Sequence, residues 1–187
     1  MKQAMRTLLF VFAASLLAAP VASAQTHKAP AATHPVAKPA AKPAAPKEIG
    51  QFDDWVAATS VENGQTICYA LSYAKHSTPA LPGRDKVVLT VTERPTIRDS
   101  VALSAGFAYA ANAAVTLQAD QTALDFYTNA RSAFARDGKA AVTAFGRAKE
   151  VSARSPGPKN ATVVDSFSLR GFSAAYAAIV KACPEKK

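Results

Sequence analysis

The chain has 187 residues, 49% of them hydrophobic, and a formal net charge of +9, which suits one globular domain with appendages. Six of its 22 basic residues and one of its 13 acidic residues precede position 49, so the rest of the chain carries 16 basic against 12 acidic side chains. This weakly basic balance, without aromatic residues interleaved in a basic patch, argues against a nucleic-acid-binding protein. It allows weak attraction to an anionic component of the cell envelope.

Residues 1–24 have the three-part pattern of a secretory signal peptide. Lys2 and Arg6 give a positive start, residues 7–19 are almost wholly apolar, and Ala22-Ser23-Ala24 is a small-residue cleavage site. The apolar stretch is shorter than the roughly 18–20 residues that a spanning helix needs. We therefore expect a periplasmic, secreted or outer-surface protein, with no transmembrane segment after signal cleavage.

Residues 25–48 are built mainly from Ala, Pro, Lys and Thr. Such a composition cannot bury a core, and its prolines favour an extended spacer. His27 and His34 lie in this segment, and we interpret them as solvated residues rather than as a metal-binding tract. The predicted organisation is therefore a signal peptide over 1–24, a flexible linker over 25–48 and a folded domain over 49–187.

The domain shows short alternating segments separated by turns, which is typical of strands. Asn63-Gly64 is a strong hairpin signal. A helix over 102–114 remains an alternative, because Ala is a poor strand former. About eight antiparallel strands predict an all-β sandwich. The expected strands are 52–59, 66–73, 86–92, 99–104, 115–118, 123–127, 150–154 and 162–169.

Two short helices are expected, one over 139–147 and one after Gly171. In the first, Ala141, Val142 and Phe145 share a face. In the second, Ser173 is the expected N-cap. The expected buried face of this second helix consists of Tyr176, Ile179, Val180 and Cys183.

The two cysteines of the chain, Cys68 and Cys183, are widely spaced. In an exported protein such a pair is more typical of a disulfide than of a metal or catalytic site. Each is the other's only possible intramolecular partner. We therefore expect a Cys68–Cys183 bridge that ties the C-terminal helix to the first part of the domain.

The sequence offers little that resembles a catalytic or metal site. His76 is the only histidine of the domain, and it follows a strand rather than a nucleophile motif. Asp53, Asp54, Asp120 and Asp125 are the candidate carboxylates for a hydrolase, but neighbouring aspartates on a strand would point to opposite faces. Trp55 fits a core position better than a ligand-stacking one. Asp165 fits an ion pair with an arginine. The candidate binding surface is a basic patch of Arg84, Lys86, Arg94 and Arg98.

Taken together, several segments resemble the invasion-associated locus B family of exported alphaproteobacterial proteins. The resemblance covers about residues 51–183, and the stretch from Asp165 to Ala175 is its most specific part. The other matching motifs are Phe52-Asp53-Asp54-Trp55, Cys68-Tyr69, Arg94-Pro95, Ser104-Ala105-Gly106-Phe107, Asp137-Gly138-Lys139 and Ala144-Phe145-Gly146.

This resemblance implies an immunoglobulin-like sandwich and, in some pathogens, a link to host-cell entry. It brings no enzymatic mechanism, cofactor or metal, and we expect none. The favoured function is a non-enzymatic interaction protein of the cell envelope or surface that binds a protein or an anionic envelope component. Two alternatives remain open, a cell-wall hydrolase that uses His76 with an aspartate and a periplasmic chaperone that offers a sheet edge to its clients.

Overall fold

The structure is a computed structural model that describes residues 45–185. The expected signal peptide over 1–24 and the expected linker up to residue 44 lie outside the described residues. The first strand begins at Lys47, two residues before the domain start expected from the sequence. Neither helix in the described part is long and apolar enough to cross a membrane.

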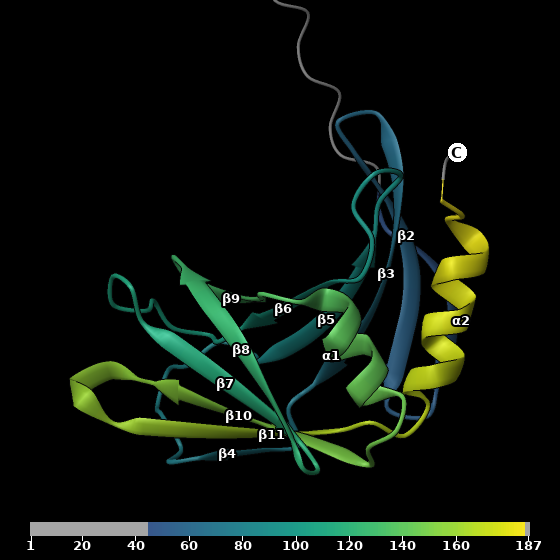
Figure 1. The fold of residues 1–187 in the computed structure, drawn as a ribbon. Coiled ribbons are helices and arrows are strands. Elements are labelled where there is room, and N and C mark those ends of the chain that lie inside the picture. Colours follow the sequence, from purple (N-terminus) through teal and green to yellow (C-terminus); the bar gives the residue numbers. More distant parts are fainter. Residues whose placement is uncertain (1–44, 186–187) are drawn as a thin grey trace, which may run out of the picture. The chain divides into compact units, whose positions relative to one another are not determined.

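The described residues form eleven strands and two α-helices (Figure 1). The strands are β1 (Lys47–Phe52), β2 (Trp55–Glu62), β3 (Gln65–Tyr73), β4 (His76–Thr78), β5 (Val88–Glu93), β6 (Ser100–Ser104), β7 (Ala114–Ala119), β8 (Thr122–Asn129), β9 (Ser132–Ala135), β10 (Glu150–Pro156) and β11 (Thr162–Ser168). The helices are α1 (Gly138–Phe145) and α2 (Phe172–Ala182), and a short 3-10 turn, η1, spans Pro158–Asn160.

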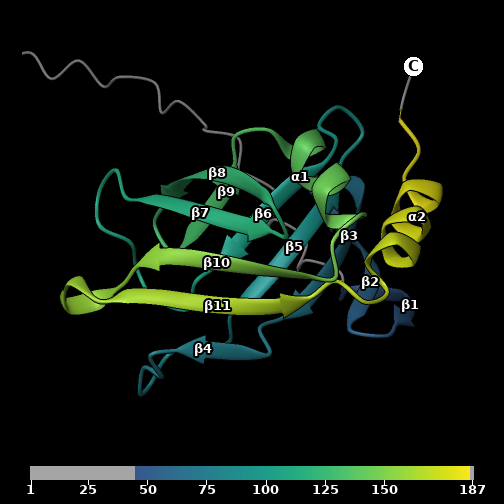
Figure 2. The ribbon, with the colours of Figure 1, turned by 60° about the horizontal axis from the view of Figure 1, so that its bottom comes forward.

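All eleven strands belong to one sheet in the order β1-β2-β3-β5-β6-β9-β8-β7-β10-β11-β4, and the paired strands are antiparallel. The sheet curls back on itself because β3 continues, after Ala74 and Lys75, into β4, which lies beside β11 (Figure 2). The Lys75 N–H donates to the Ser166 carbonyl at 2.8 Å across this join. The predicted all-β antiparallel fold with a C-terminal helix is confirmed, and its strands come from a single curled sheet.

The core lies on the inner face of this sheet. Leu89 and Leu103 from one half of the sheet and Leu117 and Phe167 from the other are fully buried in one cluster. Helix α2 packs against β1, β2 and β3, whereas α1 contacts β6 and β8 (Figure 1). The 102–114 segment contains the end of β6, a loop and the start of β7, so the helical alternative for it is wrong.

Helix α1 follows its sequence pattern closely. Its buried residues are Ala141, Val142 and Phe145, as predicted. The helix begins after Asp137, whose carboxylate accepts a hydrogen bond from the Ala140 N–H at 2.9 Å. This bond satisfies one of the free N–H groups of the first turn.

Helix α2 begins differently from the prediction. Its N-cap is Gly171 rather than Ser173, and no side chain caps the helix. Gly171 has φ +83°, and a Cβ there would lie 2.0 Å from the Phe52 carbonyl oxygen. Only glycine fits this close approach between the start of α2 and the end of β1. Of the predicted inner face, Ile179 and Cys183 are buried, whereas Tyr176 and Val180 are only half-buried. The buried residues within α2 are Phe172, Ala175 and Ile179, so its inner face is rotated from the predicted one.

The other differences lie in short strands and turns. Asp53 and Asp54 do not continue a strand from Phe52; they form the β1–β2 turn, with Asp53 at φ +48°. Aspartate favours such positions because its side chain hydrogen-bonds locally. The sequence did not reveal β1, β4 and β9. β1 includes the last two residues of the expected linker, and β4 and β9 have only three and four residues. Each is a strand because a longer neighbour, β2, β11 or β8, supplies the pairing.

Candidate functional site

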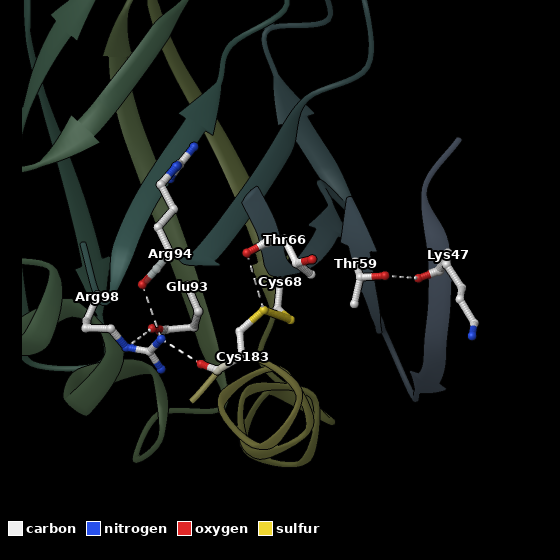
Figure 3. The surroundings of a disulfide bond; sticks show 8 residues. All are labelled: Lys47, Thr59, Thr66, Cys68, Glu93, Arg94, Arg98 and Cys183. Carbon is white, nitrogen blue, oxygen red and sulfur yellow. Dashed lines mark hydrogen bonds and ion pairs between the residues drawn. A yellow bond between two sulfur atoms is a disulfide. The ribbon is translucent and has the colours of Figure 1, made fainter. Parts of the chain in front are cut away.

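The predicted disulfide joins Cys68 on β3 to Cys183 at the end of α2 (Figure 3). The two Cα atoms are 5.8 Å apart, and both side chains are buried. The bridge spans 115 residues of sequence, a loop length for which the chain-entropy model gives about 4–5 kcal/mol of stabilisation. It therefore fastens the C-terminal helix to the β2–β3 hairpin.

A buried carboxylate lies beside this bridge. Glu93 is fully buried and is the direct cross-strand partner of Cys68. Its carboxylate pairs with the Arg98 guanidinium at 2.6 Å and accepts the Asp99 N–H at 3.3 Å. Burial, opposed by Arg98 and helped by the neighbouring Asp99 charge, raises the pKa of Glu93 to about 7. Arg98 also donates to the Cys183 carbonyl at 2.7 Å, so one guanidinium links the acid to the disulfide (Figure 3).

The same corner of the molecule holds a tyrosine from α2. The Tyr176 hydroxyl donates to Asp99 Oδ1 at 2.5 Å. Burial and this carboxylate together raise the pKa of Tyr176, so the phenol remains protonated at physiological pH. These contacts attach α2 to the β5–β6 connection and leave no deprotonated tyrosine for chemistry.

A second buried ion pair lies near the other end of β5. Arg84 binds Asp165 through two parallel hydrogen bonds of 2.8 Å, and the two side chains are only 6% and 0% exposed. Ser77 donates to the same carboxylate at 2.6 Å, and Arg84 also donates to the Ala105 carbonyl. The predicted ion pair of Asp165 with an arginine is therefore present. It joins β4, β11 and the loop before β5, which makes its role structural.

The expected basic patch does not form as one surface. Arg84 and Lys86 precede β5, whereas Arg94 and Arg98 follow it. Arg84 and Arg98 are held by buried carboxylates, and Arg94 pairs with Glu62 at 2.7 Å. The Lys86 amine lies over the Tyr73 ring, 5.0 Å from its centroid. Three of the four charges are thus neutralised locally, a contact pattern that a sequence does not show.

The carboxylates proposed for a hydrolase are scattered. Asp53 and Asp54 face Arg170 and Lys75 at the β1–β2 turn. Asp120 lies in the β7–β8 turn and Asp125 is exposed on β8.

The histidine and the tryptophan are equally remote from a catalytic arrangement. His76 is exposed on β4, and within residues 45–185 no hydrogen bond or ion pair joins it to a carboxylate. Trp55 is fully buried and donates its Nε1–H to the Ser168 carbonyl at 3.0 Å, so it is a core residue, as predicted. No group of three potential metal ligands occurs in the part of the chain that the structure describes.

One surface hollow, of about 490 Å³, lies beside β3 and the loop before β5 and is lined by Tyr73 and by the predicted Arg84 and Lys86. Two others lie along α1, where the sequence suggested no site. Lys139, Thr143 and Arg147 follow one another at helical spacing and line both of these. One hollow, of about 510 Å³, extends to the β7–β8 turn, and the other, of about 410 Å³, extends to α2 and Tyr176. The i, i+4, i+8 spacing is the sequence signal that could have identified this row. Its two cations suit a weakly bound anionic group.

The curled sheet, the buried acids and the C-terminal helix held by a disulfide define a class of small all-β proteins stapled by one long-range bridge. The chain matches the model of the family described as "Invasion associated locus B (IalB) protein" over residues 55–180, and it belongs to that family. A solved structure with a similar fold is the "Crystal structure of invasion associated protein b from bartonella henselae". That match has a TM-score of 0.52 at 17% sequence identity and covers 71% of this chain and 95% of the other. None of the curated proteins matches the chain.

Proposed function

We propose that this protein is an exported, non-enzymatic interaction protein of the cell envelope or cell surface. The observation that carries this proposal is the buried Cys68–Cys183 bridge, because structural disulfides persist in oxidising compartments. The signal-peptide pattern of residues 1–24 and membership of the IalB family support it. Residues 25–46, which precede β1, would give the domain reach from its point of attachment or release.

The scattered carboxylates and the buried ion pairs also favour binding over catalysis. A hydrolase needs an acid and a base within reach of one substrate, and the described candidates lie at separate turns and strands. If His76 served a cell-wall hydrolase, His76→Ala would abolish release of fragments from cell-wall material. We expect no such activity from the wild-type protein or the variant.

The chaperone alternative requires a free sheet edge. Strand β1 is one edge, and it carries Lys47, Glu48 and a register shift before Gly50. Charges and bulges are the features with which proteins protect edges from strand addition. The other edge, β4, has only three residues. Both edges are poor templates for a client strand.

The proposed export is tested on protein recovered from fractions of the cells that produce it. We expect the recovered chain to begin at Gln25, to fractionate with the periplasm or the medium, and to contain the Cys68–Cys183 peptide pair after non-reducing digestion. Recovery from the cytoplasm with both thiols free would contradict the proposal.

The interaction is tested by capture with the tagged mature protein. Envelope fractions and host-cell membranes serve as parallel sources, since the structural neighbour is the invasion-associated protein b of Bartonella henselae. We expect a specific partner to be retained at equal salt by the native protein and lost when the disulfide is reduced and the protein unfolds. If neither the envelope fractions nor the host-cell membranes yield a partner, an interaction role is contradicted.

A further inference from the structure

One half of the outer sheet face carries an unusual row of side chains. Strand register places six residues side by side as direct partners across β2, β3, β5, β6, β9 and β8. None of the six is charged and none is fully buried; Tyr127 is 46% exposed. We call them the outer row: Val56, Leu71, Thr90, Ala102, Phe134 and Tyr127.

The row next to it has the same character. Tyr73, Val88, Ser104, Ser132 and Asn129 are again cross-strand partners, and Tyr73 is 47% exposed. Along β3, every residue that points outward from position 67 to 73 is aliphatic or aromatic. Two neighbouring rows of this face therefore present aromatic rings, aliphatic side chains, hydroxyls and one amide, without a formal charge.

The other half of the same outer face differs. The outer row continues from Tyr127 to Ala114 on β7. The neighbouring row across β8, β7, β10 and β11 consists of Asp125, Thr116, Arg154 and Val164, and the next row contains Gln118 and Ser152. An antiparallel sheet with one solvated face normally alternates apolar inward and polar outward residues. The polar half obeys this rule, so the apolar half is not a requirement of the fold. Exposed apolar patches of this kind usually mark a binding surface.

The dimensions of the patch limit its occupant. Six strands at about 4.8 Å spacing and two or three outward rows about 6.7 Å apart give an area on the order of 400–500 Å². A stable protein–protein interface buries about 800 Å² on each partner. The patch is therefore too small to hold a second copy of the chain by itself, and it suits a ligand that lies across it as a single extended chain.

The chemistry of the patch narrows the class of ligand. β5, β6 and β9 are interior strands whose backbone is paired on both sides, so a peptide cannot add as a strand there. The two rows themselves carry no charge, and the nearby cations Lys86 and Arg136 lie over the Tyr73 and Tyr127 rings, so the rows present no cationic track to an anionic polymer. Aromatic rings set among hydroxyl groups complement the flat, C–H-bearing faces and the hydroxyls of sugar rings. From these observations, and resting on the proposed interaction function, we infer that the outer row binds a neutral glycan chain.

Two aromatic positions at the ends of the patch are the expected anchors. Tyr127 and Phe134 stack with ring centroids 5.6 Å apart, and the Arg136 guanidinium lies 5.8 Å from the Tyr127 centroid. Tyr73 is held on β3 by the Lys86 amine over its ring. β3 and β8 are four strand spacings apart in the sheet, about 19 Å. A chain of several sugar units spans that distance.

The test uses the full mature protein and three neutral hexasaccharides, maltohexaose, cellohexaose and chitohexaose. We expect at least one to bind, with an affinity that stays constant as salt is raised, because no ion pair contributes. Tyr127→Ala and Tyr73→Ala should each weaken binding about tenfold, the effect of losing one ring contact. Arg154→Ala, on the polar half of the same outer face, should leave binding unchanged. Thermal unfolding of each variant shows whether it folds. If one tyrosine variant does not fold, the other is sufficient for the test.

Three results would overturn the inference. The first is that none of the three hexasaccharides binds. The second is that Arg154→Ala weakens glycan binding as much as Tyr127→Ala does. The third is that this face binds an anionic polymer, in a salt-sensitive way, or a peptide instead of a glycan. Capture from envelope fractions distinguishes a wrong glycan inference from a wrong proposal of an interaction function. If Tyr127→Ala still retains the partner of the native protein, only the glycan inference is wrong.

Discussion

Glu93 and Cys68 are direct partners across the β3–β5 ladder, and both are fully buried. The pairing places an ionisable acid next to the disulfide that fastens α2 to the sheet, with Arg98 bonded to both sides of the junction. The stability of the C-terminal helix therefore depends on a covalent bond and on the protonation of one carboxyl group.

Replacing both cysteines, Cys68→Ser with Cys183→Ser, should lower the free energy of unfolding by about 2–5 kcal/mol, because the unfolded chain regains the freedom of a long loop. Urea unfolding measures the change. A reducing agent should destabilise the native protein to a similar extent and leave the double variant unaffected. Equal urea midpoints for the two proteins would contradict the structural role of the bridge.

The raised pKa of Glu93 predicts a stability that falls as pH rises. The folded protein holds the proton up to about pH 7, whereas the unfolded chain releases it near 4.5. Folding therefore binds a proton between these values, and the free energy of unfolding decreases across that window by at most about 3 kcal/mol. The contribution of Glu93 protonation to the free energy of unfolding is complete below pH 4.5 and is lost as pH rises through about 7.

Glu93→Gln tests this because glutamine does not titrate. Its urea stability should vary less between pH 5 and 8 than that of the native protein, in keeping with the pKa of about 7. Glu62→Gln is the matched control, since Glu62 is 47% exposed and Arg94 lowers its pKa. If the free energy of unfolding changes equally with pH in Glu93→Gln and in the native protein, Glu93 is not the source of the pH dependence.

The buried pair of Arg84 and Asp165 should be sensitive to loss of one partner. Arg84→Ala leaves a fully buried carboxylate without its counter-ion, which typically costs about 3–5 kcal/mol. Arg94→Ala breaks an ion pair in which both side chains are partly exposed and should cost no more than about 1 kcal/mol. Chemical unfolding of the two variants gives the comparison, and equal losses would mean that the Arg84 pair is not buried.

Gly171 and Gly64 form another matched pair. Both have positive φ, but a Cβ at Gly64 meets nothing within 4 Å, whereas one at Gly171 would lie 2.0 Å from the Phe52 carbonyl oxygen. Gly64→Ala should cost about 1–2 kcal/mol for the backbone conformation alone. Gly171→Ala should cost a further 1–3 kcal/mol, approximately, for the displaced backbone. Similar melting temperatures for the two variants would place Phe52 farther from α2 than described.

Local patterns predicted much of this fold. Period-2 alternation identified the longer strands, and helical spacing located Ala141, Val142 and Phe145 as the inner face of α1. The prediction of the α2 face was less accurate, since its rotation depends on how Phe172 enters the core between Trp55 and Phe145. β1, β4 and β9 were missed because their pairing partners, rather than their own residues, make them strands.

The sequence by itself determined the all-β class, the C-terminal helix and the disulfide, because alternation is a local property and two cysteines allow one bridge. Only the tertiary structure decided the partners of the arginines, the burial of Glu93 and the outer row. Arg84 and Asp165 are 81 residues apart, and their contact requires β11 and the loop before β5 to meet. Likewise, Leu71 and Phe134 share a face only through the register of β3, β5, β6 and β9. Register is set by pairing across the whole sheet, so side chains distant in sequence become neighbours only when the sheet has formed.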